Sequence, residues 1–123
     1  MDITVPYIDM RIDAITDLGQ GTPPEKLSSW VNEDVFIDMN GNFYYSVEGM
    51  CCQLERQDQL QEMIEDNSRP AWVLINRFYE WHNNKLRTIS YALASMEQLW
   101  LAFVMKEKFN KIWDGKHWVN TTT

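Results

Sequence analysis

Residues 35–48 read VFIDMNGNFYYSVE, and this stretch decides the fold class. Two short runs of β-branched and aromatic residues flank Asn40-Gly41, a preferred pair for a two-residue hairpin turn. The apolar period changes here from about 3.6 residues, typical of helices, to about 2, typical of strands. The sequence therefore predicts a β-hairpin near 35–48 within a mainly helical chain, which makes the fold α+β.

Two helices are predicted on the N-terminal side of this hairpin. The first covers 7–18, where Pro6 suits the first turn and Gly19 the end, and its apolar face consists of Ile8, Ile12, Ile15 and Leu18. The capping box Thr22-Pro23-Pro24-Glu25 predicts a second, short helix that ends near Asn32. We expect this short helix to bury Leu27, Trp30 and Val31.

Three further helices are predicted after the hairpin. The chain therefore has four or five helices, because the short apolar run at 71–75 fits a helix or a strand. Residues 53–66 have helical spacing and many acidic side chains. The next helix begins at Ser68 and Pro70, ends near Trp81 before Asn83-Asn84, and is apolar all round, which predicts a place in the core or in a subunit interface. The last covers 86–109, with an apolar seam at Leu86, Ile89, Leu93, Met96, Trp100 and Phe103.

A second hairpin is predicted near the C-terminus, at about 111–119. Asp114-Gly115 is flanked there by aromatic and aliphatic residues, and pairing about this turn places Trp113 and Trp118 on one face. The chain contains no internal repeat and no low-complexity linker. We therefore expect residues 1–123 to form one α+β domain.

Charge is distributed unevenly along the 123 residues, whose formal net charge is −7. Residues 1–66 hold 14 Asp and Glu against 3 Lys and Arg, whereas residues 67–123 hold 4 against 8. An acidic surface repels nucleic-acid phosphate, and the basic half has no Lys/Arg run that could follow a phosphate backbone. We therefore expect a basic protein partner and no direct binding of nucleic acid.

Two of the predicted helices carry carboxylates that could face such a partner. Small acidic inhibitors and immunity proteins block basic sites in this way, because complementary charge speeds association. The main hypothesis is therefore a non-enzymatic module that docks on a basic site of a partner protein and blocks it. The competing interpretation is that these carboxylates only keep helix exteriors soluble. The candidate residues are Asp9, Asp13 and Asp17 on the first helix and Glu55, Asp58, Glu62 and Glu65 on the helix over 53–66.

The alternative hypothesis is a small structural or assembly protein, either a homo-oligomer or a chaperone-like protein that docks in a larger assembly. The helix over 86–109 has more apolar surface than one partner helix would cover, and tryptophans are common interface anchors. The candidate apolar interface consists of Trp100, Leu101, Met105, Trp113 and Trp118. A simpler interpretation is that the six tryptophans fill a core built from a few large side chains.

The sequence favours no enzymatic function, and we expect neither a cofactor nor a metal. Cys51 or Cys52 could meet His82 or His117, but residue types alone give little support to such a pair. Glu62 and Glu65 share a helix face, as in enzymes that hold magnesium between acidic pairs, but neither later helix supplies a second pair. The chain contains no glycine-rich phosphate loop.

The sequence also predicts the cellular compartment. The longest apolar run, 99–105, is seven residues long, whereas a membrane span needs about twenty. The first residues, Met1-Asp2-Ile3-Thr4, lack the basic and apolar regions of a signal peptide. We therefore expect no membrane association and a cytoplasmic location, in a bacterial or phage-infected cell if the source is prokaryotic.

Overall fold

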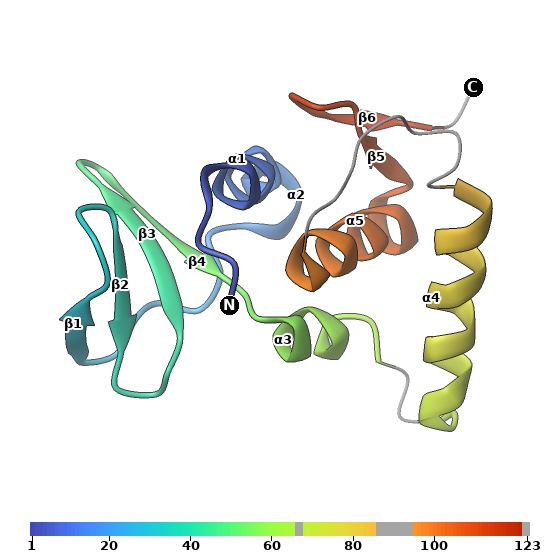
Figure 1. Ribbon diagram of the computed structural model, residues 1–123, viewed down its shortest axis with the longest axis horizontal. Helices are drawn as coiled ribbons and strands as arrows, with labels where there is room; N and C mark the ends of the chain where they lie inside the picture. Colours follow the sequence, from blue (N-terminus) through green and yellow to red (C-terminus); the bar gives the residue numbers. More distant parts are fainter. Residues whose placement is uncertain (66–67, 86–94, 122–123) are drawn as a thin grey trace.

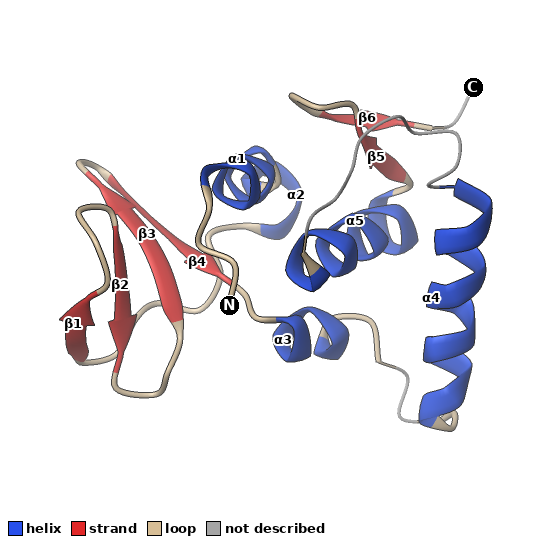
Figure 2. Ribbon diagram, viewed as in Figure 1, coloured by secondary structure: helices blue, strands red, loops and turns tan. Residues whose placement is uncertain are grey.

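The computed structural model describes residues 1–65, 68–85 and 95–121 and has the α+β class expected from the sequence. A four-stranded sheet lies on one side of the molecule, and the helices and a small hairpin lie on the other (Figures 1 and 2). The described helices are α1 (Val5–Asp13), α2 (Ile15–Leu18), α3 (Gln57–Glu62), α4 (Ala71–Lys85) and α5 (Met96–Phe109). None of these described helices is long and apolar enough to cross a membrane.

The sheet is antiparallel throughout, in the order β1 (Leu27–Trp30), β2 (Val35–Asp38), β3 (Phe43–Val47) and β4 (Met50–Leu54). The hairpin predicted near 35–48 is confirmed as β2 and β3, with Val35 opposite Tyr45. Its turn is held by Asp38, whose Oδ1 accepts hydrogen bonds from the backbone N–H groups of Asn40 at 2.9 Å and Asn42 at 3.0 Å. Gly41 has a φ of 80°, which favours glycine there.

The short helix predicted over 22–32 is wrong, because residues 27–30 form β1 instead. Ser29 pairs with Ile37 and Trp30 with Phe36, so tertiary pairing overrides the local capping signal. The capping residue Thr22 is used differently, since its N–H donates to Gln53 Oε1 at 2.9 Å and ties the loop to β4. Trp30 and Val31, expected to be buried, are 55% and 44% exposed.

The helix predicted over 53–66 is confirmed only in its middle, as α3 (Gln57–Glu62). Residues 50–54 form β4, and α3 begins at Gln57. Cys52 and Leu54 are completely buried on one face of β4, while the intervening Gln53 is covered by the loop at Thr22 on the other. This strand could not be recognised from the sequence because Gln53 is polar but buried, whereas a sequence pattern assigns polar residues to solvent.

The predicted helix over 7–18 is confirmed, with a break at Ala14 between α1 and α2. The buried face of this helix differs from the predicted one. It consists of Tyr7, Ile8, Met10, Arg11 and Ala14. Helix α4 continues to Lys85, past the end predicted near Trp81 and through Asn83-Asn84. An asparagine costs a helix interior less than about 1 kcal/mol, so Asn83-Asn84 is too weak a signal to end the helix.

Helix α5 begins at Met96, where the Ser95 hydroxyl accepts a hydrogen bond from Gln98 N–H at 3.1 Å. The start predicted at Leu86 and the seam positions 86, 89 and 93 lie outside the described residues. Helix α5 is the centre of the core, between α1, α3, α4 and the C-terminal hairpin (Figure 1). Phe78 of α4 stacks on Trp100 of α5, with ring centroids 4.1 Å apart.

The predicted C-terminal hairpin is confirmed as β5 (Lys111–Trp113) and β6 (Trp118–Asn120). Trp113 is opposite Trp118, and their ring centroids are 5.1 Å apart. Trp118 Nε1 donates to the Met10 carbonyl at 2.8 Å. This hydrogen bond fixes the hairpin against α1, at the other end of the sequence.

Candidate docking surface

The predicted acidic row of the first helix contacts the basic end of the same chain. Asp17 forms an ion pair with Lys111 at 2.8 Å. Asp13 Oδ2 accepts from Trp118 N–H at 2.9 Å, and its Oδ1 lies 3.0 Å from His117 Nδ1. Asp9 is exposed beside a groove of about 310 Å³ between α1 and the hairpin. Asp13 and Asp17 therefore hold the C-terminal hairpin, and Asp9 is the row's one carboxylate without a partner among the described residues.

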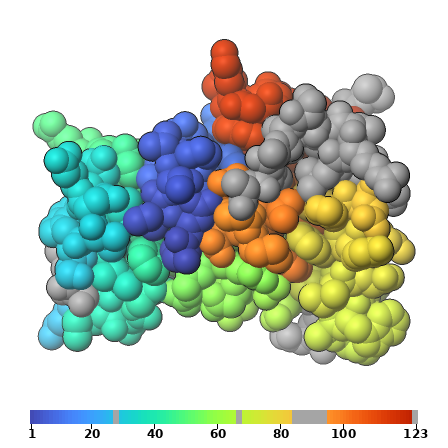
Figure 3. All heavy atoms as spheres, in the orientation of Figure 1, coloured from blue at the N-terminus to red at the C-terminus, as the bar shows by residue number. Residues whose placement is uncertain are grey.

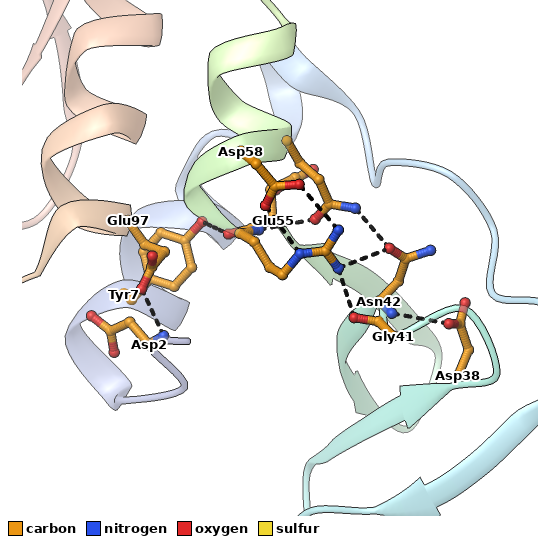
Figure 4. Close-up of polar contacts among 10 residues, drawn as sticks. Asp2, Tyr7, Asp38, Gly41, Asn42, Glu55, Asp58 and Glu97 are labelled. Atoms are coloured by element: carbon orange, nitrogen blue, oxygen red, sulfur yellow. Dashed lines mark hydrogen bonds and ion pairs between the residues drawn. The ribbon is translucent and has the colours of Figure 1, made fainter.

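Glu55 is buried in an ion pair and does not reach the surface. The Arg11 Nε and Nη2 atoms lie 2.6 and 3.1 Å from its two carboxylate oxygens, and the two side chains are 0% and 2% exposed. Burial lowers the pKa of Arg11, but the hydrogen bonds and charge of Glu55 outweigh burial and raise this pKa above its usual value. Tyr7 donates its hydroxyl to the Glu55 carbonyl at 2.7 Å (Figure 4). Glu55 is thus a structural residue.

The acidic residues of α3 and its flank are exposed, but one of them is paired. Asp58 Oδ1 lies 3.1 Å from Arg56 Nε, and this pairing is the main cause that lowers the pKa of Asp58. Arg56 Nη1 also donates to the Gly41 carbonyl at 2.7 Å, so it joins the β2–β3 turn to α3. Glu62 and Glu65 are exposed and have no partner among the described residues.

The five residues predicted as an apolar interface lie in the core of the same chain. Their exposed fractions are 0–7%, because α5 is covered on several sides and the two hairpin tryptophans pack on each other. This corrects the prediction and favours the interpretation that large rings fill the core. The five buried residues are Trp100, Leu101, Met105, Trp113 and Trp118.

One end of the four-stranded sheet carries three exposed carboxylates, those of Glu33, Asp34 and Glu48. We call the surface formed by residues 30–34 and 48–49 the sheet tip. Asn32 Oδ1 holds the first turn by accepting from the backbone N–H groups of residues 34 and 35, both at 2.9 Å. Ser46 N–H donates to the Asp34 carbonyl at 2.7 Å, which brings the two turns together. The three carboxylates have no partner among the described residues.

Trp30 stands at the edge of this acidic surface. Its ring packs edge-on against Phe36 at 5.1 Å, and Phe36 stacks on Tyr44 at 5.3 Å, so the exposed indole is supported from below. Residues 27–55 contain no Lys or Arg, and β1 is an edge strand of the sheet. This surface could not be predicted while the capping signal at Thr22 placed Trp30 in a buried helix. The available signal was the turn composition of Asn32-Glu33-Asp34 before β2.

The groups considered for catalysis are spread over several elements. Cys51 and Cys52 lie on β4, whereas His82 lies on α4 and His117 in the β5–β6 turn. Burial raises the pKa of Cys52 to about 11, which keeps its thiol protonated. Within the described part of the chain, no three His, Cys, Asp or Glu side chains are grouped to hold a metal ion. Comparison with protein-family models, curated proteins and solved structures finds no match to this chain.

Proposed function

We propose that this chain is a non-enzymatic protein-binding module that docks on a basic site of a partner protein and blocks it, as inhibitors and immunity proteins do. The sheet tip is the docking surface. The observation that supports the proposal is the set of three open carboxylates beside an exposed tryptophan, on a sheet segment without any Lys or Arg. The docking surface proposed here therefore lies on the sheet, and not on α1 and α3 as the sequence predicts.

Charge and aromatic area have separate roles at such a surface. The carboxylates attract a basic partner over about 10 Å at 0.1 M salt and repel acidic proteins, which gives association rate and selectivity. Trp30 supplies the apolar contact, since tryptophan is among the residues most enriched at energetic centres of interfaces. Its support by Phe36 reduces the entropy lost when the indole is buried on binding.

The edge strand β1 indicates which form of basic partner would fit. It pairs with β2 on one side and ends the sheet on the other. An extended segment of the partner can add to such an edge through main-chain hydrogen bonds, and its side chains then alternate between the two sheet faces. An extended segment in which Lys or Arg alternates with apolar residues would meet both Trp30 and the carboxylates.

A selection from a displayed peptide library on the immobilised protein tests the proposal. We expect enrichment of peptides that alternate basic and apolar residues. Their affinity should fall steeply between 0.1 M and 1 M salt, because the Debye length shortens from about 10 Å to about 3 Å. The variant E33Q/D34N/E48Q should lose at least about tenfold in affinity, and Trp30→Ala should weaken binding even at high salt.

The matched control is D9N/E62Q/E65Q, which removes the same amount of charge at exposed carboxylates of α1, α3 and its flank. This control should bind the selected peptides as the wild type does. Enrichment of peptides without basic residues, or equal binding by the sheet-tip variant, would refute the proposal. A loss of peptide affinity in the control variant alone would show that the docking surface lies on α1 and α3.

A further inference from the structure

Helix α4 forms the end of the molecule opposite the sheet (Figures 1 and 3). Its inward face packs on α5, where Phe78 stacks on Trp100 and Trp81 lies 5.3 Å from Phe103. Its outward face carries three exposed apolar side chains, next to the exposed polar residues Asn76 and Glu80. Trp72, Ile75 and Tyr79, spaced as successive positions on one helix face, are 67%, 54% and 62% exposed. We call these three residues the α4 stripe.

We propose that the α4 stripe is the interface between two copies of this chain, paired antiparallel across a twofold axis beside Ile75. The inference does not depend on the sheet tip or on any basic partner. It replaces the buried tryptophans of α5 and the C-terminal hairpin as the surface for self-association.

The order of side chains along the stripe supports a second copy as the occupant. An aromatic residue stands at each end and an aliphatic residue between them. In a twofold antiparallel pair, each patch meets itself in reverse order. Trp72 of one copy then lies against Tyr79 of the second copy, and the two Ile75 side chains meet at the axis.

The area of the stripe is also suitable for such a pair. An aromatic side chain offers about 150–250 Å² of surface, so the three exposed fractions leave roughly 350–400 Å² uncovered. A standard interface buries about 800 Å² on each partner, a little over half of it apolar. The stripe would therefore supply most of the apolar centre, and exposed polar residues beside it, such as Asn76, would supply the rim.

Charge favours α4 over the other surfaces as a contact between identical acidic chains. Residues 71–85 carry Arg77, Glu80 and Lys85, so this helix has no net negative charge. The proposed pairing brings Glu80 of each copy beside Ala71 of the second copy. Ala71 is the first residue of α4, where the helix dipole favours a carboxylate. The acidic sheet tips stay apart at the two far ends of the dimer.

Sedimentation equilibrium from 1 µM to about 500 µM protein, at low and high salt, tests the proposal. We expect a monomer–dimer equilibrium that changes little with salt. Ile75→Arg places two like charges at the axis and should raise the dimer dissociation constant at least about 30-fold. Ile75 is 54% exposed, so this variant should keep the circular dichroism spectrum of the wild type.

The control is Met39→Arg, which places the same side chain at a residue that is 65% exposed in the β2–β3 turn. This control should form dimers like the wild type. An engineered Ile75→Cys should cross-link two copies under mild oxidation faster than the wild-type cysteines do. A wild type that is monomeric throughout, an assembly larger than a dimer, or a dimer that Ile75→Arg leaves intact would overturn the proposal.

Discussion

Asp2 shows how a single carboxylate joins two segments that are distant in the sequence. Its Oδ2 accepts from Ser95 Oγ at 2.6 Å and from Gln98 Nε2 at 2.8 Å, and its Oδ1 accepts from Thr4 N–H at 2.9 Å. Burial raises the pKa of Asp2, but these hydrogen bonds outweigh it and lower the pKa below 3.8. The charged carboxylate therefore stabilises the contact between the N-terminal segment and the start of α5.

Asp2→Asn should lower the free energy of unfolding by about 1–3 kcal/mol at pH 7, because it removes charge-assisted hydrogen bonds. The folded pKa lies below the unfolded one, so this stabilisation is fully present above about pH 4 and is lost as the pH falls through the folded pKa. Urea unfolding at pH 7 and near pH 2.5 measures the effect. The difference between variant and wild type should shrink at low pH, whereas an equal difference at both would show that the ionised form is unimportant.

At the scale of elements, the pattern of apolar residues predicted most of the helices and both hairpins. The β2–β3 and β5–β6 hairpins could be predicted because Asn40-Gly41 and Asp114-Gly115 determine a turn locally. Strands β1 and β4 could not be predicted from the sequence pattern. Each gains its stability from the neighbouring strand, and buried Gln53 and exposed Trp30 both depart from the usual pattern of burial.

The candidate residues were less predictable than the elements, because partners within the chain are distant in the sequence. Acidity at Asp13 and Asp17 indicates a basic neighbour, but the pattern does not say whether it belongs to another protein. The structure supplies Lys111 and His117 of the same chain. Glu55 resembles any surface glutamate in the sequence, and only the fold brings Arg11 against it.

The contact between α1 and the C-terminal hairpin leads to a prediction at this scale. Asp13→Ala should lower the free energy of unfolding by about 1–3 kcal/mol, because it leaves the Trp118 N–H without its acceptor. Asp9→Ala, one turn away and exposed, should change it by less than about 0.5 kcal/mol. Urea unfolding followed by tryptophan fluorescence compares the two variants. Equal effects would mean that the Asp13 carboxylate does not hold the hairpin.

At the scale of the whole molecule, the ion pair of Arg11 and Glu55 joins the helices to the sheet. Arg11 lies on α1, and Glu55 follows the last residue of β4. Arg11 Nη1 is buried and has no hydrogen-bond partner among the described residues. The stability of the pair therefore depends on both members being present.

Glu55→Leu should lower the free energy of unfolding by about 3–5 kcal/mol, because it leaves a buried guanidinium without its counter-charge. Adding Arg11→Met should restore much of that loss, since two apolar side chains can fill the same volume. A double-mutant cycle by urea unfolding gives the coupling free energy. Additive losses from the two substitutions would show that the pair is solvated and that the sheet is joined to the helices by other contacts.

The hydrogen bond from Trp118 to Met10 also sets the order in which the molecule can be completed during synthesis. The two residues are 108 positions apart, so a ribosome delivers α1 long before the indole that closes over it. Residues 7 and 11 of the nascent α1 can meet Glu55 early, but the part of α1 that Trp118 covers stays exposed, or is covered by a chaperone, until residue 118 has emerged. Contacts this distant in sequence slow folding. Closure of the hairpin over α1 is therefore a late step that requires residue 118, whereas the β2–β3 hairpin can form while the residues after it are still being translated.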